Sequence, residues 1–378
     1  MQSERCRLCL LPSCVITLTN GVCSQCSHED HKVNYKGEAE LIKVLDHHKK
    51  IARQNGNKYD CLVSISGGKD STYTLFKLVN KYDMNVLGFT YEHSFSDKQA
   101  ILNVNNAVKI LGVDLIRNTD DKEQNRYLKH NILEIGRQHP ESIARLSSLL
   151  CVGCSDGYVK KADKIAKDNN ISLIMQGGSP VEPDMKFFGE KQGGEKFLKL
   201  AIKELGEVIS CPIFYDLRYY KNITRQMASI KEVSKFNINK ILQPISWQSK
   251  ISRHHFFDYI EWNEQEIIST LENKLEWRRP IDRKTTTRFD CVIHILLDTL
   301  YRRYMGISDI EVMYSIMVRK KMLSRVEAIN RAKLEIEEEE QLLDKTLRNI
   351  LAKLNESSKY DEVKQIWNKS SDSCVWDL

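Results

Sequence analysis

The chain has 378 residues, of which 41% are hydrophobic and 29% are charged, and it holds only seven prolines. These values are typical of a globular protein with two or three structural units, and they exclude a disordered or fibrous chain. The 57 basic and 51 acidic side chains leave a net charge of +6, which gives little support to a nucleic-acid partner. No apolar run is long enough to span a bilayer and the N-terminus is polar, so we expect a cytoplasmic protein without membrane insertion.

Residues 1–34 are rich in cysteine and are too short of apolar residues to bury a core of their own. Two cysteine pairs give the spacing C-x2-C-x13-C-x2-C: Cys6, Cys9, Cys23 and Cys26. This spacing is close to that of tetrahedral zinc knuckles and ribbons, so we expect a Zn²⁺ module over 1–34. Cys14 and His28 are alternative ligands, and four free surface thiols are the alternative to metal binding.

Residues 35–250 alternate between predicted strands and predicted helices. Apolar positions at helical spacing predict a first helix over 37–53. Strands are predicted over 60–65, 86–90, 114–117 and 171–175, with helices ending near 81 and spanning 97–111, 122–138 and 156–169. This order predicts an α/β catalytic domain with a doubly wound parallel sheet. Glycines near 189–194, followed by a helix over 197–204, predict an active-site lid or an insertion.

Residues 251–378 are predicted to form a mainly helical region that completes the active site. Helical spacing covers 264–275, 291–303, 308–320 and 324–355. Ser324 and Glu327 have capping-box spacing, which gives the last long helix a start. The acidic run from Glu335 to Glu340 predicts a solvent-exposed helix face without a function.

The segment Ser66-Gly-Gly-Lys-Asp-Ser71 follows an apolar strand and opens a predicted helix. Gly67 and Gly68 allow the backbone N–H groups to approach phosphate oxygens closely, and the helix N-terminus favours negative charge. The remaining four residues add donors or charge: Ser66 and Ser71 as hydroxyl donors, Lys69 as a cation and Asp70 as a Mg²⁺ ligand. The spacing differs from that of a Walker A loop.

This loop resembles the SGGxDS loop of the PP-loop ATP pyrophosphatases, which are adenine nucleotide alpha hydrolase-like proteins. The resemblance implies ATP and Mg²⁺ as cofactors, Lys69 and Asp70 as catalytic residues, and adenylation of a carbonyl or carboxyl oxygen. Gly177 and Gly178 end the last predicted strand, at the sheet edge where ligands of α/β folds bind. They are either further ATP contacts or a plain turn.

A third cysteine pair, Cys151 and Cys154, lies between predicted helices of the catalytic domain. Some PP-loop sulfur-transfer enzymes hold a [4Fe–4S] cluster with such a pair and one later cysteine. The resemblance implies Cys291 as the later ligand, with Cys211 as the alternative. Simple packing of the pair, or zinc binding, is the competing interpretation.

In order along the chain, five features resemble the N-acetyl sugar amidotransferase family of surface-polysaccharide biosynthesis, over nearly the whole sequence. They are the N-terminal cysteines, the Ser66–Ser71 loop, Cys151 with Cys154, the Arg288-Phe-Asp-Cys291 segment and the segment 322–328. Membership implies that ATP activates an acetamido sugar substrate and that ammonia, delivered by a separate glutaminase subunit, gives an acetamidino sugar. The chain has no glutaminase nucleophile elbow of its own.

Two other functions compete with the amidotransferase. One is a [4Fe–4S]-dependent sulfur transferase that thiolates tRNA or a small molecule, and the other is an ATP- and zinc-binding module without turnover. The stretch 277–291 mixes basic, hydroxyl and acidic groups. It serves either to bind a phosphorylated substrate or to hold the start of a helix.

Overall fold

The computed structural model describes residues 4–27, 33–135, 150–182, 251–285 and 287–368. The predicted glycine loop at 189–194, the predicted helix at 197–204 and Cys211 lie outside these residues. None of the described helices is both long and apolar enough to cross a membrane.

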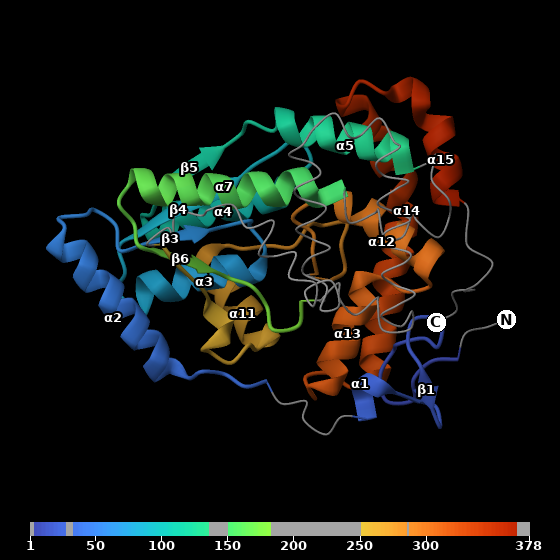
Figure 1. The fold of residues 1–378 in the computed structure, drawn as a ribbon, viewed down its shortest axis with the longest axis horizontal. Helices are drawn as coiled ribbons and strands as arrows, with labels where there is room; N and C mark the ends of the chain where they lie inside the picture. The colour runs from blue at the N-terminus through green and yellow to red at the C-terminus, as the bar shows by residue number, and fades with distance from the viewer. Residues whose placement is uncertain (1–3, 28–32, 136–149, 183–250, 286, 369–378) are drawn as a thin grey trace, which may run out of the picture.

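Five parallel strands form the central sheet of the molecule (Figure 1). They are β3 (Cys61–Ser64), β4 (Val86–Tyr91), β5 (Asp114–Asn118), β6 (Leu173–Gln176) and β7 (Ser252–His255). Their order across the sheet is β5-β4-β3-β6-β7. The chain therefore builds the sheet outward in one direction from β3, and then in the other direction from β6. Between β3 and β6 the order reverses, which is where open α/β sheets bind their ligands.

Helices cover both faces of this sheet, as the alternation of strand side chains requires. Cys61, Val63 and Leu173 point into one core, whereas Leu62 and Ile174 point into a second core on the opposite face. The first face is covered by α2 (Glu38–Gln54), α3 (Lys69–Asn80), α4 (Lys98–Leu111) and α11 (Glu264–Leu275). The second is covered by α7 (Val152–Asp168), and α5 (Lys122–Ile135) packs beside α7. The predicted α/β, doubly wound parallel sheet is confirmed.

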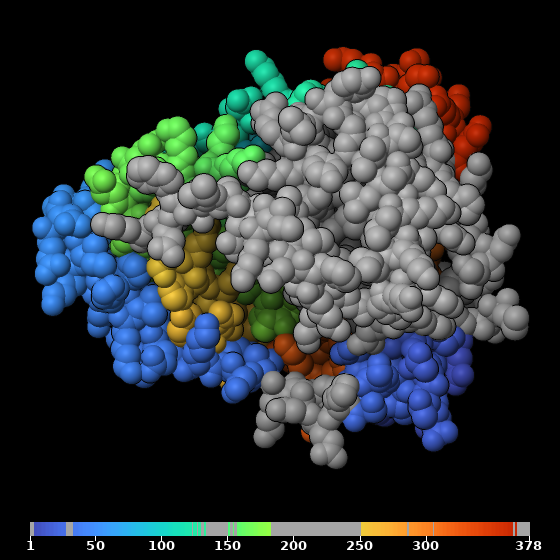
Figure 2. Space-filling model, in the orientation of Figure 1, coloured from blue at the N-terminus to red at the C-terminus, as the bar shows by residue number. Residues whose placement is uncertain are grey.

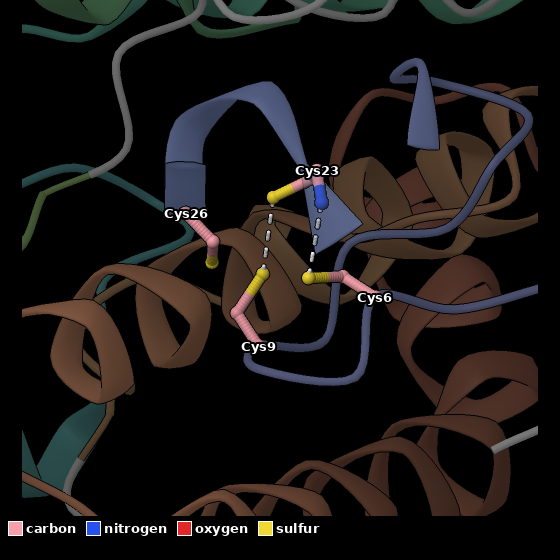
Figure 3. Close-up of side chains that lie close together, drawn as sticks. All are labelled: Cys6, Cys9, Cys23 and Cys26. Carbon is pink, nitrogen blue, oxygen red and sulfur yellow. Dashed lines mark hydrogen bonds between the residues drawn. The ribbon is translucent and has the colours of Figure 1, made fainter. Parts of the chain in front are cut away.

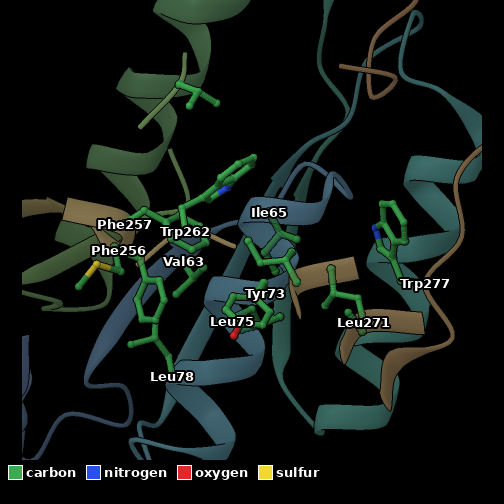
Figure 4. Close-up of a cluster of buried hydrophobic side chains, with 14 of the residues drawn as sticks. Val63, Ile65, Tyr73, Leu75, Leu78, Phe256, Phe257, Trp262, Leu271 and Trp277 are labelled. Atoms are coloured by element: carbon green, nitrogen blue, oxygen red, sulfur yellow. The ribbon is translucent and has the colours of Figure 1, made fainter. Parts of the chain in front are cut away.

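Figure 4 shows part of the first core, where residues far apart in the sequence meet. Val63 and Ile65 of the β3 segment lie among side chains of α3, such as Leu75, and of the region after β7, such as Phe257. Burial of each such side chain contributes about 1.5–3 kcal/mol, so β3 and α3 are held firmly on either side of the turn between them. The start of α3 is thereby fixed relative to the sheet edge.

The C-terminal region is helical, as predicted. It contains α12 (Ile293–Met305), α13 (Asp309–Arg319), α14 (Arg325–Lys353) and α15 (Tyr360–Asn368). Ser324 accepts a hydrogen bond from the backbone N–H of Glu327 and so caps α14, as its spacing predicts. The Glu327 side chain pairs with Arg331. A full capping box occurs instead at Ser308 and Glu311, at the start of α13.

The prediction that the acidic run is exposed was wrong for three of its five glutamates, whereas Glu337 and Glu340 are exposed as predicted. Glu335, Glu338 and Glu339 on α14 are only 2%, 5% and 1% exposed. The helix packs against both α12 and α13, which supply partners that local sequence cannot reveal. Glu339 pairs with Arg302, and Glu338 accepts a hydrogen bond from the backbone N–H of Lys284.

Two further elements depart from the predicted pattern. Strand β7 lies just after residue 250 and completes the catalytic sheet. Its sequence Ser-Arg-His-His lacks the apolar alternation of a strand, because β7 is the last strand at one edge of the sheet. Helix α7 begins at Val152, so Cys154 lies within its first turn and not between helices.

Candidate active site and cysteine groups

The glycine loop, Ser66–Ser71, connects β3 to the first turn of α3. Gly67 has φ +84°, and a Cβ there would lie 2.1 Å from the Ala100 carbonyl oxygen, so only glycine fits. Within the loop, Ser66 N–H donates to Ser71 Oγ (3.2 Å) and Gly68 N–H to Ser66 Oγ (3.3 Å). These hydroxyls therefore lie at the N-terminus of α3, where backbone N–H groups and the helix dipole favour an anion.

Two residues from distant segments hold the glycine loop through the carbonyl oxygen of Gly67. Trp277 Nε1 donates to this oxygen at 2.9 Å, and Asn103 Nδ2 donates at 3.2 Å. Asn103 Oδ1 in turn accepts from the backbone N–H of Arg278. Part of the 277–291 stretch thus acts as a brace for the loop.

Lys69 and Asp70 form an ion pair at 3.1 Å, and Trp262 organises it. Trp262 Nε1 donates to the second carboxylate oxygen of Asp70 at 2.7 Å, while Lys69 Nζ lies 5.4 Å from the centre of the Trp262 ring. Although burial opposes the charge of Lys69, the carboxylates of Asp70 and Glu264 raise its pKa, so it stays cationic. Sequence reasoning missed Trp262, since a lone tryptophan outside a periodic segment carries no signal.

The turn after β6 meets the glycine loop, as the strand order requires. A Cβ on Gly177 would lie 2.5 Å from Ser71 Cα and 2.7 Å from the carbonyl oxygen of Asp70. A Cβ on Gly178 would lie 2.6 Å from His255 Nδ1 at the end of β7. Gly177 thus permits close backbone packing and lines the pocket described next, whereas Gly178 makes room for the His255 ring and does not line the pocket.

One pocket opens in front of the glycine loop, with about 740 Å³ of empty space that includes its mouth. Its charged lining residues are Lys69, Asp70, Glu182, Glu264, Arg288 and Asp290. Trp262, Phe289, Met313 and Met317 add apolar surface. Asp70 is paired with Lys69 and Glu264 with Arg331, so the carboxylates of this pocket are partly neutralised by the protein's own cations. A bound phosphate would add negative charge that a cation such as Mg²⁺ would offset.

Arg288 and Asp290 reach the pocket from the segment before α12. Arg288 has the left-handed φ of +37°, a strained conformation that is common at functional sites. Its Nη1 donates to Asp309 Oδ2 at 2.9 Å, and that carboxylate helps to raise the pKa of Arg288 against the effect of burial. Asp290 hydrogen bonds with Ser66, while burial raises the pKa of its carboxyl. This part of the 277–291 stretch therefore faces the pocket.

The four N-terminal cysteines converge on one point (Figure 3). Their sulfurs lie within 4.8 Å of one another, and Cys9 Sγ is 3.7 Å from Cys23 Sγ. Zinc–sulfur bonds of about 2.3 Å in tetrahedral geometry place sulfurs roughly 3.8 Å apart, so the site fits a single metal ion. Hydrogen bonds from Cys23 and Cys26 lower the pKa of the Cys9 thiol, whereas the pKa values of Cys23 and Cys26 are raised, so a cation would be needed to keep all four as thiolates. Cys14 is not part of this group.

The N-terminal module is built on β1 (Leu18–Thr19), β2 (Val22–Cys23) and α1 (Ser24–Ser27), and it packs against α13. Figures 1 and 2 show it beside the C-terminal helices. Arg325, the first residue of α14, donates from Nε to the carbonyl oxygen of Cys9 and from Nη2 to that of Cys6. Arg5 forms a largely buried ion pair with Glu311 of α13 at 2.8 Å. The cysteine loops are thus held by the helical region.

The structure places the three cysteines of the predicted cluster, Cys151, Cys154 and Cys291, near one another but without the close sulfur spacing of the N-terminal four. Cys291 interacts electrostatically with both of the others, and it precedes α12 where a short β-bridge pairs it with Ser96. Burial raises the pKa of Cys151 to about 11 and of Cys154 to about 12. Among the described residues, only the N-terminal four form a ligand group within 4.8 Å, so this central group is more widely spaced.

Asp290 connects the central cysteines with the glycine loop. It precedes Cys291, its charge acts on Cys154, and its carboxyl hydrogen bonds with Ser66. The backbone N–H of Asp97, the N-cap of α4, donates to the Asp290 carbonyl oxygen at 3.0 Å. Asp290 therefore lies between the pocket, which it lines, and the central cysteines, which do not line it.

No family model matches the chain. A stretch of 113 residues is 30% identical to the uncharacterized protein MJ1599 of Methanocaldococcus jannaschii, covering 25% of this chain and 41% of that protein. The chain thus matches about two fifths of that relative's length. The U34-tRNA thiolase NcsA from Methanococcus maripaludis, solved with its [4Fe–4S] cluster, aligns over 85% of this chain and 88% of its own, with 15% identity and a TM-score of 0.32. At that TM-score, the likeness establishes neither a shared activity nor a shared cofactor.

Proposed function

We propose that this protein is an ATP-dependent transferase that forms AMP and pyrophosphate by adenylating an oxygen atom of its substrate. The observation that carries the proposal is the position of the glycine loop. It joins β3 to the N-terminus of α3 at the point where the strand order reverses, and it presents Ser66, Ser71 and Lys69 to the pocket. This is a phosphate-binding arrangement.

The residues of the pocket divide the work of adenylation between them. Lys69 neutralises negative charge on the pyrophosphate, and Asp70, held by Trp262, binds Mg²⁺. The substrate oxygen attacks the α-phosphorus of ATP, and pyrophosphate leaves with the electron pair of the broken bond. The substrate carbon then carries AMP, a good leaving group, in place of a poor one.

The second step replaces AMP with another atom, and two chemistries remain under consideration. The family resemblance favours nitrogen, with ammonia from a glutaminase subunit acting on an acetamido sugar. The convergence of Cys151, Cys154 and Cys291 beside the pocket instead favours sulfur transfer, on a tRNA or a small molecule. Although the amidotransferase resemblance includes the same cysteines, we favour sulfur, because thiols beside the pocket can hold a sulfur-delivering cluster, whereas ammonia needs no thiol.

Two metal sites accompany this proposal. The N-terminal four cysteines would hold Zn²⁺, since their sulfur spacing suits one tetrahedral ion. The central cysteines would hold a [4Fe–4S] cluster, which with three protein ligands offers an open iron that can carry sulfur. Three thiols are the number of protein ligands that such a cluster needs if one iron is to stay open, whereas a structural zinc site takes four.

The products of ATP cleavage test the first step. The protein, purified under anaerobic conditions, is incubated with ATP and either a nucleotide-linked diacetamido sugar plus ammonium or unmodified tRNA plus sulfide. We expect the wild type to form AMP and pyrophosphate with one of these two substrate combinations, and Lys69→Ala to form neither product. ADP as the product would overturn the proposal.

The same incubation separates nitrogen from sulfur. A brown visible absorbance with roughly four irons per chain, together with thiolated product, supports sulfur transfer. Stoichiometric zinc without iron, together with acetamidino product, supports the amidotransferase. Lys77→Ala is a suitable control for Lys69→Ala, because Lys77 lies two turns later on α3 and does not line the pocket.

A further inference from the structure

The buried carboxylate of Glu335 is unlike its neighbours on α14. Glu339 pairs with Arg302, and Glu338 accepts a backbone N–H. Within the described residues, Glu335 has no ion pair with a lysine or arginine, and its partners are the hydroxyls of Tyr314, Thr285 and Thr287. Burying a carboxyl group with only neutral partners is costly, so its retention points to a task beyond packing.

Thr287 links this carboxyl group to the pocket. Its side chain lines the pocket, and Thr287 Oγ1 lies 3.5 Å from Tyr314 Oη, at the limit of a hydrogen bond. Tyr314 Oη donates to Glu335. A continuous series of hydroxyl groups therefore runs from the pocket to a carboxyl group that is only 2% exposed. Such a series conducts protons by successive donation.

Charged and titratable groups face Glu335 from several elements, and together they place the pKa of its carboxyl group near neutral. Burial raises the pKa of Glu335 to about 7, and the negative Glu339 adds to this effect, whereas the hydrogen bond from Tyr314 opposes it. The other groups that face this cluster are Lys69 on α3, Glu264 on α11 and Arg331 on α14. A carboxyl group that titrates near neutral pH both accepts and releases protons.

We infer that Glu335, acting through Tyr314 and Thr287, receives the proton that the substrate loses during adenylation, and that the substrate is an amide or lactam. The inference rests on the proposed adenylation. When an amide oxygen attacks the α-phosphorus, the new O–P bond forms, pyrophosphate leaves, and the adjacent N–H must lose its proton. That proton passes to Thr287 and on to Glu335, giving a neutral carboxylic acid. A carboxylate substrate has no such proton and needs no relay.

Infrared difference spectroscopy tests the relay without any substrate. In the full-length protein, a protonated-carboxyl band that titrates near pH 7 is expected in the wild type and absent in Glu335→Gln. Glu338→Gln, one turn later and equally buried, is the matched control and keeps the band. Tyr314→Phe keeps it with a higher midpoint, because the hydrogen bond that lowers the pKa is gone, and it serves as the second variant if Glu335→Gln does not fold. A wild type without this band overturns the inference.

Turnover then connects the relay to the reaction. The probes are the diacetamido sugar and the tRNA named above, and the readout is pyrophosphate release as a function of pH. We expect the wild-type rate to fall below about pH 7, and Glu335→Gln to lose this acid limb and roughly 10²-fold in kcat while its KM for ATP stays within about twofold. An acid limb that persists in Glu335→Gln overturns the relay. If the wild type releases no pyrophosphate, the proposed function is wrong. The infrared titration still shows, independently, whether the Glu335 carboxyl group titrates near pH 7.

Discussion

The two cysteine groups of this protein differ in the number of their thiols, in their spacing and in their position relative to the pocket. In the N-terminal group, four sulfurs lie within 4.8 Å, and Arg325 fixes the backbone that carries two of them. In the central group, three more widely spaced thiols border the pocket through Asp290. On the proposed assignment, a closed set of four ligands would serve folding, whereas three ligands next to the pocket would leave a position for chemistry. Ligand number and surroundings, more than residue type, separate structure from function here.

The most direct test of this difference between the two cysteine groups is to remove one of the four N-terminal cysteines. We expect Cys9→Ser to lose its stoichiometric metal and more than about 4 kcal/mol of unfolding free energy, because metal binding and folding of the module are coupled. Elemental analysis and urea unfolding measure the two effects. Cys61→Ser is the control, since Cys61 is a fully buried cysteine of β3 outside both groups, and its metal content should not change. Full metal content in Cys9→Ser would contradict a four-cysteine site.

Removal of a central cysteine should affect activity far more than stability. We expect Cys291→Ser to change the unfolding free energy by less than about 1 kcal/mol and to reduce product formation more than about 10²-fold, equivalent to about 2.7 kcal/mol in the barrier. Urea unfolding and product analysis under anaerobic conditions check both values. Wild-type product formation by Cys291→Ser would remove the central cysteines from the reaction and restore nitrogen as the leading choice.

The contact between the N-terminal module and α14 gives a smaller effect. Arg325→Ala leaves the carbonyl oxygens of Cys6 and Cys9 without their guanidinium partner, so we expect a loss of about 1–3 kcal/mol with metal still bound. Faster metal release to a chromogenic chelator is the expected kinetic sign. Arg348→Ala is the comparison, because Arg348 pairs with Asp344 on the exposed side of α14 and should cost less than about 1 kcal/mol. Equal losses in the two variants would show that the contact is unimportant.

The smallest expected effect concerns ATP alone and leaves both cysteine groups intact. Trp262→Phe keeps the ring but removes the hydrogen bond to Asp70, so we expect roughly a tenfold higher KM for Mg·ATP, or about 1.4 kcal/mol. Metal content and the visible spectrum should remain those of the wild type. An unchanged KM over a range of Mg²⁺ concentrations would show that Asp70 does not depend on Trp262.

Much of the fold follows from short-range patterns. The buried strands β3, β4 and β6 read as apolar runs, and the helices between them have regular apolar spacing, so the α/β alternation was predictable. The spacing of the N-terminal cysteines likewise predicted their convergence. Strand β7 escaped prediction because its polar sequence pairs at the edge of the sheet, where neighbouring strands rather than local propensity decide the conformation.

The parts of the site that escaped prediction depend on partners distant in the sequence. The burial of Glu335 is decided by Tyr314, Thr285 and Thr287, which no pattern within α14 reveals. Trp262 reaches Asp70 across 192 positions of the chain. The glycine loop, by contrast, was visible because its chemistry is contained in six consecutive residues. Motifs of consecutive residues can be predicted from a sequence, whereas contacts between distant residues cannot.

Helix α14 begins at Arg325, which donates to the loops of Cys6 and Cys9, and carries Glu335 ten residues later, about 15 Å along the helix axis. The N-terminal cysteine loops and the proposed proton relay therefore contact the same helix. A newly made chain that lacks its metal would have a loosened end on this helix and, we expect, would leave ATP uncleaved. Helix α14 would then couple metal binding at the N-terminal cysteines to the geometry of the pocket.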